Sequence, residues 1–357
     1  MENENANIDH TKTSVLFRVL VTLFVESVIC IILGYGGYLV WNKTFTAGQL
    51  MEFIGYFNAV IWPIMAVSEL IDMSSRGKAS LERIGHLLEA EINVKDRENV
   101  ESLPNIRGDI EFRDLTFRYP DGEFDCLKNI SFKINAGENV GLVGKTGSGK
   151  TTLVDLILRT YNVPDGTLFI DGHDVNTVSI RDIREGCAYV PQDNFLFSDT
   201  IENNISFGID PNATAVTNAA RMADIHSNIK EFQQGYGTVL GERGVTVSGG
   251  QKQRISIARA LMKDAPILIL DDSVSAVDTK TETTILQNLR STRSGKTTIL
   301  IAHRISTIER MDKILFIDDG YLAAVGTHNE LYESNEEYRK MVDLQRLEEE
   351  GGEHNNA

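Results

Sequence analysis

Gly144-Lys145-Thr146-Gly147-Ser148-Gly149-Lys150-Thr151 fits the pattern G-x-x-x-x-G-K-[ST] and follows an apolar run at residues 140–143. The run predicts a buried strand and residues 150–159 predict a helix, which is the setting of a phosphate loop. Glycines let backbone N–H groups approach a phosphate, and a helix N-terminus adds a partial charge of about +0.5. We expect Lys150 to reach the β- and γ-phosphates and Thr151 to ligate Mg²⁺. A glycine-rich turn without a ligand is the alternative.

Composition narrows the class of protein. The 357 residues have room for one large domain and a smaller one. The net charge of −16 argues against a nucleic-acid partner, because clustered Lys and Arg bind phosphate backbones. Cys30, Cys126 and Cys187 show neither C-x-x-C spacing nor a histidine cluster, so we expect reduced thiols without a metal.

Two apolar segments precede the motif. Residues 1–13 are polar, lack the features of a signal peptide and predict a loose lead-in. Residues 15–41 are almost wholly apolar and long enough to cross a bilayer, and a weaker segment containing Pro63 follows at residues 50–71. Two transmembrane helices are the favoured interpretation, and a buried hairpin of a soluble domain is the alternative.

Basic residues predict the topology of this region. They outnumber the single Lys43 between the segments on both flanks: Lys12, Arg18, Arg76, Lys78 and Arg83. We therefore expect a multi-pass protein of the cell membrane with both termini and the soluble domain in the cytoplasm. Residues 14–88 then hold two spanning helices and an amphipathic exit helix, and residues 89–107 form a charged linker.

Short apolar runs alternate with helical patterns in the soluble domain, predicted at residues 108–347. Residues 110–119 and 127–134 alternate like antiparallel strands around a turn. Later runs lie at residues 167–171, 187–190, 266–271, 297–302 and 313–317. This order predicts an α/β domain with a parallel sheet between helices. The acidic tail at residues 348–357 is predicted to be disordered.

Two further stretches carry chemistry. Asp271 ends an apolar strand, where a parallel sheet presents ligand-binding groups, and is a candidate partner of Mg²⁺; a helix cap is the alternative. Ser248-Gly249-Gly250-Gln251 opens a helix, with Ser248 placed as its N-cap and glycines exposing backbone amides. A second anion-binding helix start suggests that two copies face each other across shared nucleotides.

In this order the motifs resemble the nucleotide-binding domain of type I ABC exporters, over about residues 110–345. The resemblance implies an α/β P-loop NTPase fold, the ABC ATPase, with a parallel-sheet core, an antiparallel β subdomain and a helical subdomain. It identifies the Walker A loop at residues 144–151, the end of Walker B at Asp271, the signature motif at residues 248–251 and the D-loop at residues 275–278. Residues 241–244 resemble a loop that touches the membrane domain.

The resemblance also implies the roles of single residues. Tyr119 would stack on adenine, Gln192 would sense Mg²⁺ and the membrane domain, and His303 would contact the γ-phosphate. The expected cofactors are ATP and Mg²⁺. The candidate ATP-binding residues are Tyr119, Gly144, Lys145, Thr146, Gly147, Ser148, Gly149, Lys150, Thr151, Thr152, Ser248, Gly249, Gly250, Gln251 and Asp278. The candidate metal ligands are Thr151, Gln192 and Asp271, and the candidate catalytic residues are Asp272, His303 and Gln192.

Two departures from the family pattern change the expectation. Asp272 stands where the family usually has a glutamate that polarises the attacking water, and it withdraws the carboxylate by roughly 1.5 Å, one C–C bond. A misplacement near 1 Å can cost about 100-fold in rate, so we expect ATP to bind well and to be hydrolysed slowly. This resembles heterodimeric multidrug exporters with one degenerate site; a homodimer with a slow aspartate is the alternative.

The second departure is length. Family half-transporters carry six spanning helices, whereas this chain has room for about two, so it resembles the C-terminal part of a half-transporter. The implied function is ATP-driven export of a small, hydrophobic or drug-like substrate, with a second half-transporter and membrane lipid as partners. The rival hypotheses are an ATP-occupied regulatory module with little turnover, and a soluble ABC ATPase acting on DNA or ribosomes.

Overall fold

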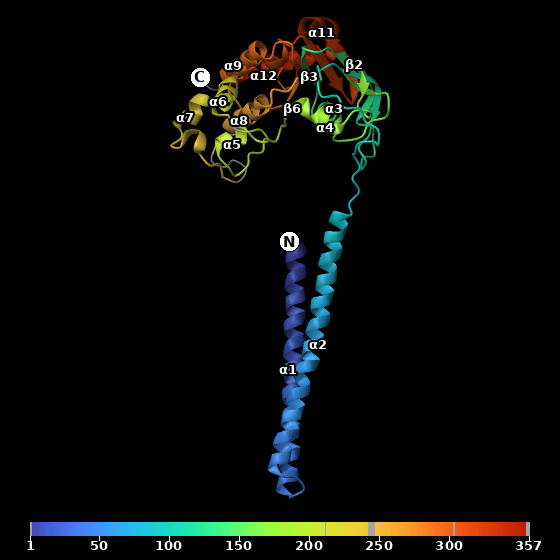
Figure 1. Cartoon of the computed structure of the whole chain (residues 1–357), viewed down its shortest axis with the longest axis vertical. Helices are drawn as coiled ribbons and strands as arrows, with labels where there is room; N and C mark the ends of the chain where they lie inside the picture. The colour runs from blue at the N-terminus through green and yellow to red at the C-terminus, as the bar shows by residue number, and fades with distance from the viewer. Residues whose placement is uncertain (1, 211, 242–246, 303, 355–357) are drawn as a thin grey trace. The chain divides into compact units, whose positions relative to one another are not determined.

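The computed structural model describes residues 2–210, 212–241, 247–302 and 304–354 of the chain. The chain divides into two compact units, Met1–Glu91 and Ile92–Ala357. The first is a helical hairpin, and the second is an α/β domain (Figure 1). The second unit begins earlier than residue 108, where the sequence predicts its start.

The hairpin consists of α1 (Glu2–Trp41) and α2 (Ala47–Leu88). A capping box starts α2: the Thr46 hydroxyl accepts from the backbone N–H of Gln49 at 3.3 Å, and the Gln49 side chain accepts from the Thr46 N–H at 2.9 Å. Pro63 lies inside α2, which runs without a break through both the second apolar segment and the predicted exit helix.

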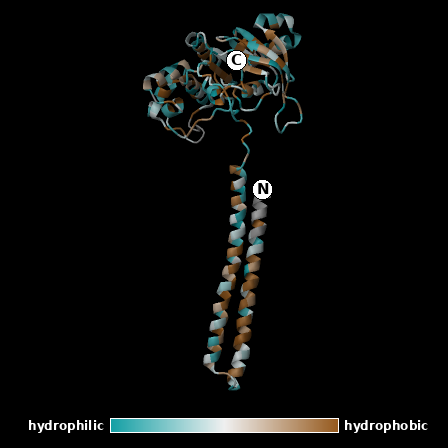
Figure 2. Ribbon diagram, turned by 45° about the vertical axis from the view of Figure 1, so that its right-hand side comes forward, coloured by the Kyte–Doolittle hydropathy of each residue, from teal (hydrophilic) through white to brown (hydrophobic). Residues whose placement is uncertain are grey.

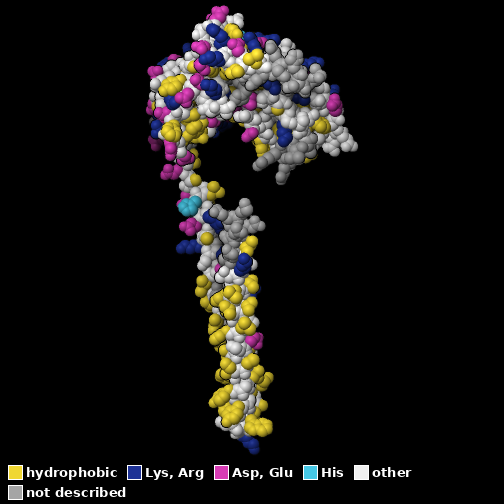
Figure 3. Space-filling model, turned by 180° about the vertical axis from the view of Figure 1, so that it is seen from behind, with side chains coloured by type: hydrophobic (Ala, Val, Ile, Leu, Met, Phe, Trp, Pro, Cys, Tyr) yellow, Lys and Arg dark blue, Asp and Glu magenta, His cyan; other side chains and the backbone are white. Residues whose placement is uncertain are grey.

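The apolar side chains of both helices face outward. Both helices are long and apolar enough to cross a membrane. Hydrophobic residues cover the hairpin in Figures 2 and 3, and Leu16, Phe24 and Trp62 are each more than half exposed. Such a surface is costly in water, so it matches the transmembrane interpretation better than the alternative of a buried soluble hairpin.

Both ends of the chain contain more helix than the sequence suggested. Helix α1 begins at Glu2, so the prediction of a loose lead-in at residues 1–13 is wrong for the described part. Residues 2–33 contain no glycine or proline, and extending a helix costs less than starting one. Helix α12 (Glu336–His354) likewise continues into the tail predicted to be disordered, where glutamates favour helix.

A six-stranded sheet forms the centre of the second unit. Its strands are β10 (Tyr321–Gly326), β9 (Lys313–Asp318), β3 (Asn139–Val143), β8 (Thr297–Ile301), β7 (Ile267–Asp271) and β6 (Cys187–Val190), in that spatial order. All neighbours are parallel except β10, which pairs antiparallel with β9 at the edge. The prediction of a parallel sheet is confirmed. The carboxyl ends of β3, β8, β7 and β6 therefore lie along one edge.

A second, antiparallel sheet lies beside it. Its order is β2 (Leu127–Ile134), β1 (Ile110–Phe117), β4 (Leu168–Ile170) and β5 (His173–Asp174). Phe112 pairs with Phe132 across β1 and β2, and their rings stack at 4.6 Å. The antiparallel register of β1 and β2 confirms the predicted strand pair. Buried and exposed residues largely alternate along both strands, as expected when one face of an antiparallel sheet packs on a core.

Helices cover both faces of the central sheet. The helices of the domain are α3 (Lys150–Ile157), α4 (Ile180–Glu185), α5 (Ile201–Ile205), α6 (Ala213–Met222), α7 (His226–Glu231), α8 (Gly249–Met262), α9 (Thr279–Thr292), α10 (Ile305–Ile308) and α11 (His328–Ser334), besides α12. Helices α5 and α6 pack on α8 rather than on the sheet, and α7 packs on α6. Along β7, Ile267 and Ile269 join the core that contains α3, whereas Leu268 and Leu270 join the core that contains α8. This alternation fixes which face of the sheet each helix covers.

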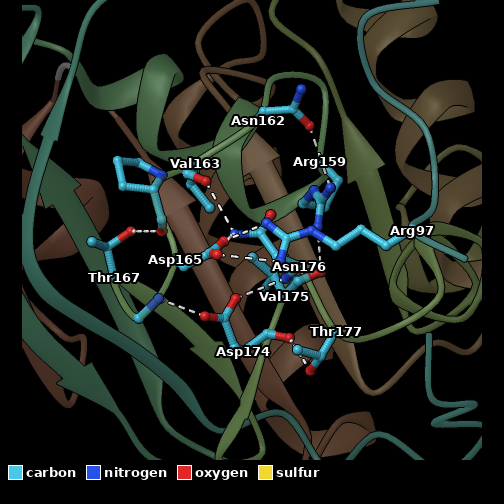
Figure 4. A network of polar contacts seen from close by, with 12 residues as sticks. Arg97, Arg159, Asn162, Val163, Asp165, Thr167, Asp174, Val175, Asn176 and Thr177 are labelled. Carbon is cyan, nitrogen blue, oxygen red and sulfur yellow. Dashed lines mark hydrogen bonds and ion pairs between the residues drawn. The ribbon is translucent and has the colours of Figure 1, made fainter. Parts of the chain in front are cut away.

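The segment predicted as a linker is bonded to the domain, and we call residues 93–107 the strap. Figure 4 shows its main anchor: Arg97 donates two hydrogen bonds to the carboxylate of Asp165, one of them at 3.2 Å. The Asn162 side chain donates to the carbonyl of Asn93 at 2.7 Å. These contacts tie the strap to the loop that follows the P-loop helix α3.

Buried groups behind this anchor hold the loop itself. Asn176 donates to the Val163 carbonyl at 3.0 Å and to Asp165 at 2.8 Å (Figure 4). Arg159 is buried and donates to the carbonyl of Val175, and burial lowers the pKa of its guanidinium. The strap therefore packs on an ordered surface. Its charged composition alone does not distinguish it from a loose linker.

Candidate functional site

The loop between β3 and α3 is shaped by its glycines. A Cβ atom on Gly144 would lie 2.0 Å from the carbonyl oxygen of Ile317, and one on Gly149 would lie 2.6 Å from the side chain of Leu127. Gly149 also has φ +102°, a left-handed conformation that favours glycine. The backbone of β9 and the start of β2 thus approach the loop so closely that only glycine fits at these two positions.

Two buried polar side chains at this loop, Lys150 and Ser148, are placed to bind an anion. Lys150 is buried, and its Nζ donates to the carbonyls of Gly144 and Lys145 at 2.8 Å each. Burial lowers the pKa of Lys150, while the nearby carboxylates of Asp271 and Asp272 act in the opposite direction. The Ser148 hydroxyl is buried without a hydrogen-bond partner in the described structure. These groups fit an anion with several acceptor oxygens, such as a polyphosphate.

Asp271 lies where the sequence predicts a magnesium ligand. It ends β7, is buried, and lies 3.4 Å from the Tyr189 hydroxyl. Burial raises the pKa of Asp271, although hydrogen bonds from Thr151 and Tyr189 lower it. The Thr151 hydroxyl and the Asp271 carboxylate supply the hard oxygen ligands that Mg²⁺ prefers, and this ion usually takes its remaining ligands from water and phosphates.

The buried charge of Asp271 leads to a prediction about stability. We expect Asp271→Asn to raise the melting temperature of the ligand-free chain at pH 8 by about 2–4 °C, because an amide of the same shape removes the cost of burying a carboxylate. Thermal unfolding followed by circular dichroism would measure it. The same variant should lose its response to Mg²⁺ with ATP.

The pH dependence of this gain has a definite sign. The folded-state pKa of Asp271 lies above its unfolded value, so the folded state binds the proton more tightly. Wild-type stability therefore falls, relative to the variant, as pH rises through that raised pKa, and the difference vanishes in acid where both states are protonated. A gain that is equal at pH 4 and pH 8 would contradict this explanation.

Asp272 connects Walker B to the D-loop. It has φ +46°, and its N–H donates to the Ile301 carbonyl of β8 at 3.0 Å. Its own carbonyl accepts from the Ser275 hydroxyl at 2.8 Å. The backbone of this candidate catalytic residue is therefore held on both sides, and its half-buried carboxylate adds to the field at Lys150.

The signature motif starts α8 as predicted. The Ser248 hydroxyl accepts from the N–H of Gln251 at 3.3 Å, and the Gln251 side chain accepts from the N–H of Ser248 at 3.0 Å. This capping box confirms Ser248 as the N-cap. Ser248 and Gly249 are exposed at the domain surface.

The signature helix also packs on the D-loop, a contact that sequence reasoning missed. A Cβ atom on Gly250 would lie 2.9 Å from the carbonyl of Ala276, and the buried Gln253 side chain accepts from the Ala276 N–H at 3.0 Å. Gln253 follows Gly250 by three positions, so both lie on one helix face. That spacing was the available signal. Among the described residues, no hydrogen bond or ion pair joins residues 248–251 to the Walker A loop of the same chain.

The remaining predicted residues lie in different settings. Tyr119 packs edge-on against Tyr161, and its hydroxyl lies 2.8 Å from that of Thr152 in α3, so its ring is tied to the P-loop helix. Gln192 is exposed in the loop after β6, the neighbour of β7. Asp278 caps α9 by accepting from the N–H of Thr281 at 3.0 Å, which lowers its pKa.

Some predictions fall on residues that the structure does not describe. His303 is one of them, and so are residues 242–244 of the loop predicted to touch the membrane domain. The described candidates that come together are the Walker A loop, Asp271, Asp272 and Tyr119 with Thr152. The signature motif and Asp278 gather at a different place, around the D-loop.

Comparisons with known proteins agree with these motifs. The model of the ABC transporter family matches residues 127–275. A probable multidrug resistance ABC transporter ATP-binding/permease protein, YheI, of Bacillus subtilis is 44% identical over 340 residues, covering 94% of this chain and 58% of that protein. The uncharacterized ABC transporter ATP-binding protein YknU of the same organism is 41% identical over 319 residues, covering 88% of this chain and 54% of that protein.

A solved structure is similar over both units of the chain. It is the structure of a bacterial Atm1-family ABC exporter with ATP bound, with a TM-score of 0.74 and 36% sequence identity, covering 89% of this chain and 57% of that one. The chain thus spans between half and two thirds of the length of the proteins it resembles.

Proposed function

Because this chain carries the ATP-binding domain of the ABC transporter family, we propose that it is the ATP-binding and membrane-anchored part of an exporter subunit. The observation that carries the proposal is the buried Lys150 inside a glycine cradle, beside the unpartnered Ser148 hydroxyl and the strand-end carboxylate of Asp271. This combination suits a magnesium–nucleotide complex, because each group matches a different part of it.

In the proposed ATP site the chain's residues act mainly by position. The loop amides and Lys150 would hold the phosphate oxygens, while Thr151 and Asp271, with Gln192, would hold Mg²⁺, which neutralises phosphate charge when bound. Tyr119 would stack on the adenine, close to the P-loop helix. The Asp272 carboxylate would accept a hydrogen bond from the attacking water, and His303 would contact the γ-phosphate.

We further propose that the ATP site is completed by a second chain. Ser248 and Gly249 are exposed at the capped start of α8, where the N–H groups of the first turn have no carbonyl partner within the helix, and the neighbouring Gly250 packs on the D-loop. The phosphate oxygens of a nucleotide held by a partner's Walker A loop are the natural acceptors for amides at such a helix start. Closure on ATP and reopening after hydrolysis would then drive the helices of the first unit.

A photo-crosslinking amino acid placed at Ser248 tests this arrangement. In membranes supplied with Mg²⁺ and ATP, we expect a crosslink to the Walker A peptide of another ABC chain, and mass spectrometry of the adduct would distinguish a homodimer from a heterodimer. Without nucleotide the yield should fall at least several-fold. The same amino acid at the exposed Glu337 of α12 serves as the control and should give no such adduct.

The result that contradicts the proposal is equally clear. If the adduct at Ser248 forms only within one chain, or forms equally with and without ATP, the nucleotide does not lie between two chains.

The membrane unit supports export as the coupled process. Two helices with outward-facing apolar side chains fit a lipid environment, with both ends of the chain and the ATPase domain in the cytoplasm. We propose a small hydrophobic or drug-like substrate, in line with the multidrug description of the relative YheI. We propose that a second half-transporter, a different chain rather than a second copy, completes the pathway.

One observation favours a second candidate function. The Asp272 side chain is shorter than the glutamate that would position the attacking water correctly. The chain could therefore hold ATP as a regulatory module with little turnover. Single-turnover hydrolysis with trapped nucleotide separates the two functions: retention of intact ATP over many minutes supports the regulatory module, and release of phosphate supports the ATPase.

A further inference from the structure

The segment that follows position 303 is held by two distant helices. It consists of Arg304 and the short helix α10, and we call it the switch segment, residues 304–308. It begins directly after the residue proposed above to contact the γ-phosphate. A side chain that fixes this segment therefore acts on the chain directly next to that residue.

The first contact comes from α9. Glu282 is buried with 4% exposure, and its carboxylate forms an ion pair with Arg304 at 3.3 Å. The same carboxylate accepts a hydrogen bond from the Thr307 hydroxyl. Arg304 also donates to the carbonyl of Ser275 in the D-loop at 3.4 Å. The buried carboxylate of Glu282 thus joins Arg304 and Thr307 to α9, and Arg304 itself reaches the D-loop.

The second contact comes from the C-terminal helix. Arg304 occupies the N-cap position of α10, but a guanidinium has no acceptor with which to cap a helix. The side-chain oxygen of Gln345, 40 positions further along the chain, accepts from the Ile305 N–H at 2.8 Å instead. Gln345 therefore acts as a cap supplied from another helix.

Helix α12 is anchored so that Gln345 reaches this amide. Tyr338 and Val342 are fully buried, and Gln345 follows them by seven and three positions on the same helix face. The Tyr338 ring packs edge-on against Phe316 of β9 at 5.8 Å, and its hydroxyl lies 2.9 Å from Nδ1 of His328. The central sheet thus fixes α12, and α12 in turn fixes the switch segment.

From this geometry we infer that Gln345 and Glu282 are positioning residues for ATP hydrolysis. They clamp the switch segment, which directly follows the residue proposed to contact the γ-phosphate, from the C-terminal helix and from the D-loop helix. The inference rests on the proposed function for the role of position 303. It adds that the C-terminal helix takes part in the hydrolysis step.

The Gln345→Ala variant of the full chain provides the main test. We expect kcat for ATP hydrolysis to fall about three- to tenfold, the rate equivalent of one net hydrogen bond, while KM for ATP changes less than twofold. The backbone amides of residues 304–308 should exchange with deuterium at least about threefold faster, because the Ile305 N–H loses its acceptor. Gln345→Glu keeps an acceptor at the same reach and should restore both values.

A matched control separates the clamp from a general effect on α12. Lys340→Ala removes an exposed side chain whose ion pairs are confined to α12, and it should leave kcat and exchange unchanged. Glu282→Gln should lower kcat further, but breaking a buried ion pair can unfold the domain, so Gln345 carries the test.

The inference is overturned if Gln345→Ala leaves both kcat and amide exchange unchanged, or if Gln345→Glu is as impaired as the alanine variant. Exchange requires no turnover. A wild-type chain without hydrolysis would therefore refute the ATPase proposal, while the exchange of residues 304–308 would still decide whether the clamp exists.

Discussion

Replacing Gly144 with alanine is expected to weaken ATP binding by more than about 100-fold. The new Cβ would lie 2.0 Å from the Ile317 carbonyl and 2.8 Å from the Ser148 hydroxyl. Ile317 belongs to β9, which is held between β3 and β10 and cannot withdraw, so the phosphate loop must move instead. A displacement of the loop amides by about 1 Å is enough to account for a loss of this size. Equilibrium binding of radiolabelled ATP to the purified chain would measure the loss.

Gly166→Ala is the matched control for this experiment. Gly166 also has a positive φ, +74°, but a Cβ there meets nothing within 4 Å. It should cost about 1 kcal/mol of stability from backbone strain and leave ATP binding unchanged. If Gly144→Ala binds ATP like the wild type, the close approach of β9 does not shape the nucleotide site.

Replacing Asp272 with glutamate is expected to raise ATP hydrolysis at this chain's Walker site by up to about 100-fold. The longer side chain restores roughly 1.5 Å of reach towards the attacking water. The rate should be measured in membranes that contain the proposed dimer, because the proposal above assigns part of the site to a second chain's signature motif. Asp272→Asn keeps the length but removes the carboxylate, and it should be no faster than the wild type.

The same substitution should cost stability. Asp272 has φ +46°, a conformation that aspartate tolerates better than longer side chains. We expect Asp272→Glu to destabilise the chain by up to about 1 kcal/mol while it becomes more active. If the glutamate variant hydrolyses ATP no faster, whereas changes in the partner's Walker site abolish activity, the degenerate-site hypothesis would be falsified.

Local patterns in the sequence were sufficient for much of this architecture. The apolar run before Gly144 predicted β3, and the alternation around Phe112 predicted β1. Both predictions were possible because the pattern of apolar residues within a strand reflects which of its faces are buried. Ser248 was recognisable as a helix cap from its neighbours alone. The apolar runs before the Walker A loop and before Asp271 likewise predicted that both lie at the carboxyl edge of the sheet.

Contacts between distant segments could not be predicted in this way. The strap reads as a charged linker, and only the positions of Asp165 and Asn162, more than 60 residues later, turn it into an ordered segment. Gln345 in an acidic C-terminal helix carries no local sign that it caps α10. The polar composition of residues 1–13 wrongly predicted a loose segment, because extending α1 towards the N-terminus costs less than starting a new helix.

The strap also decides where the α/β domain can be separated from the helical hairpin. An autonomous fragment must start at or before Asn93, because a cut at residue 108 would strip Asp165 of its guanidinium and leave the Asn162 amide without its acceptor. The boundary of the folding unit therefore lies within the segment that the sequence predicts as a linker. A shorter fragment would leave unpaired polar groups beside the helix that follows the phosphate loop.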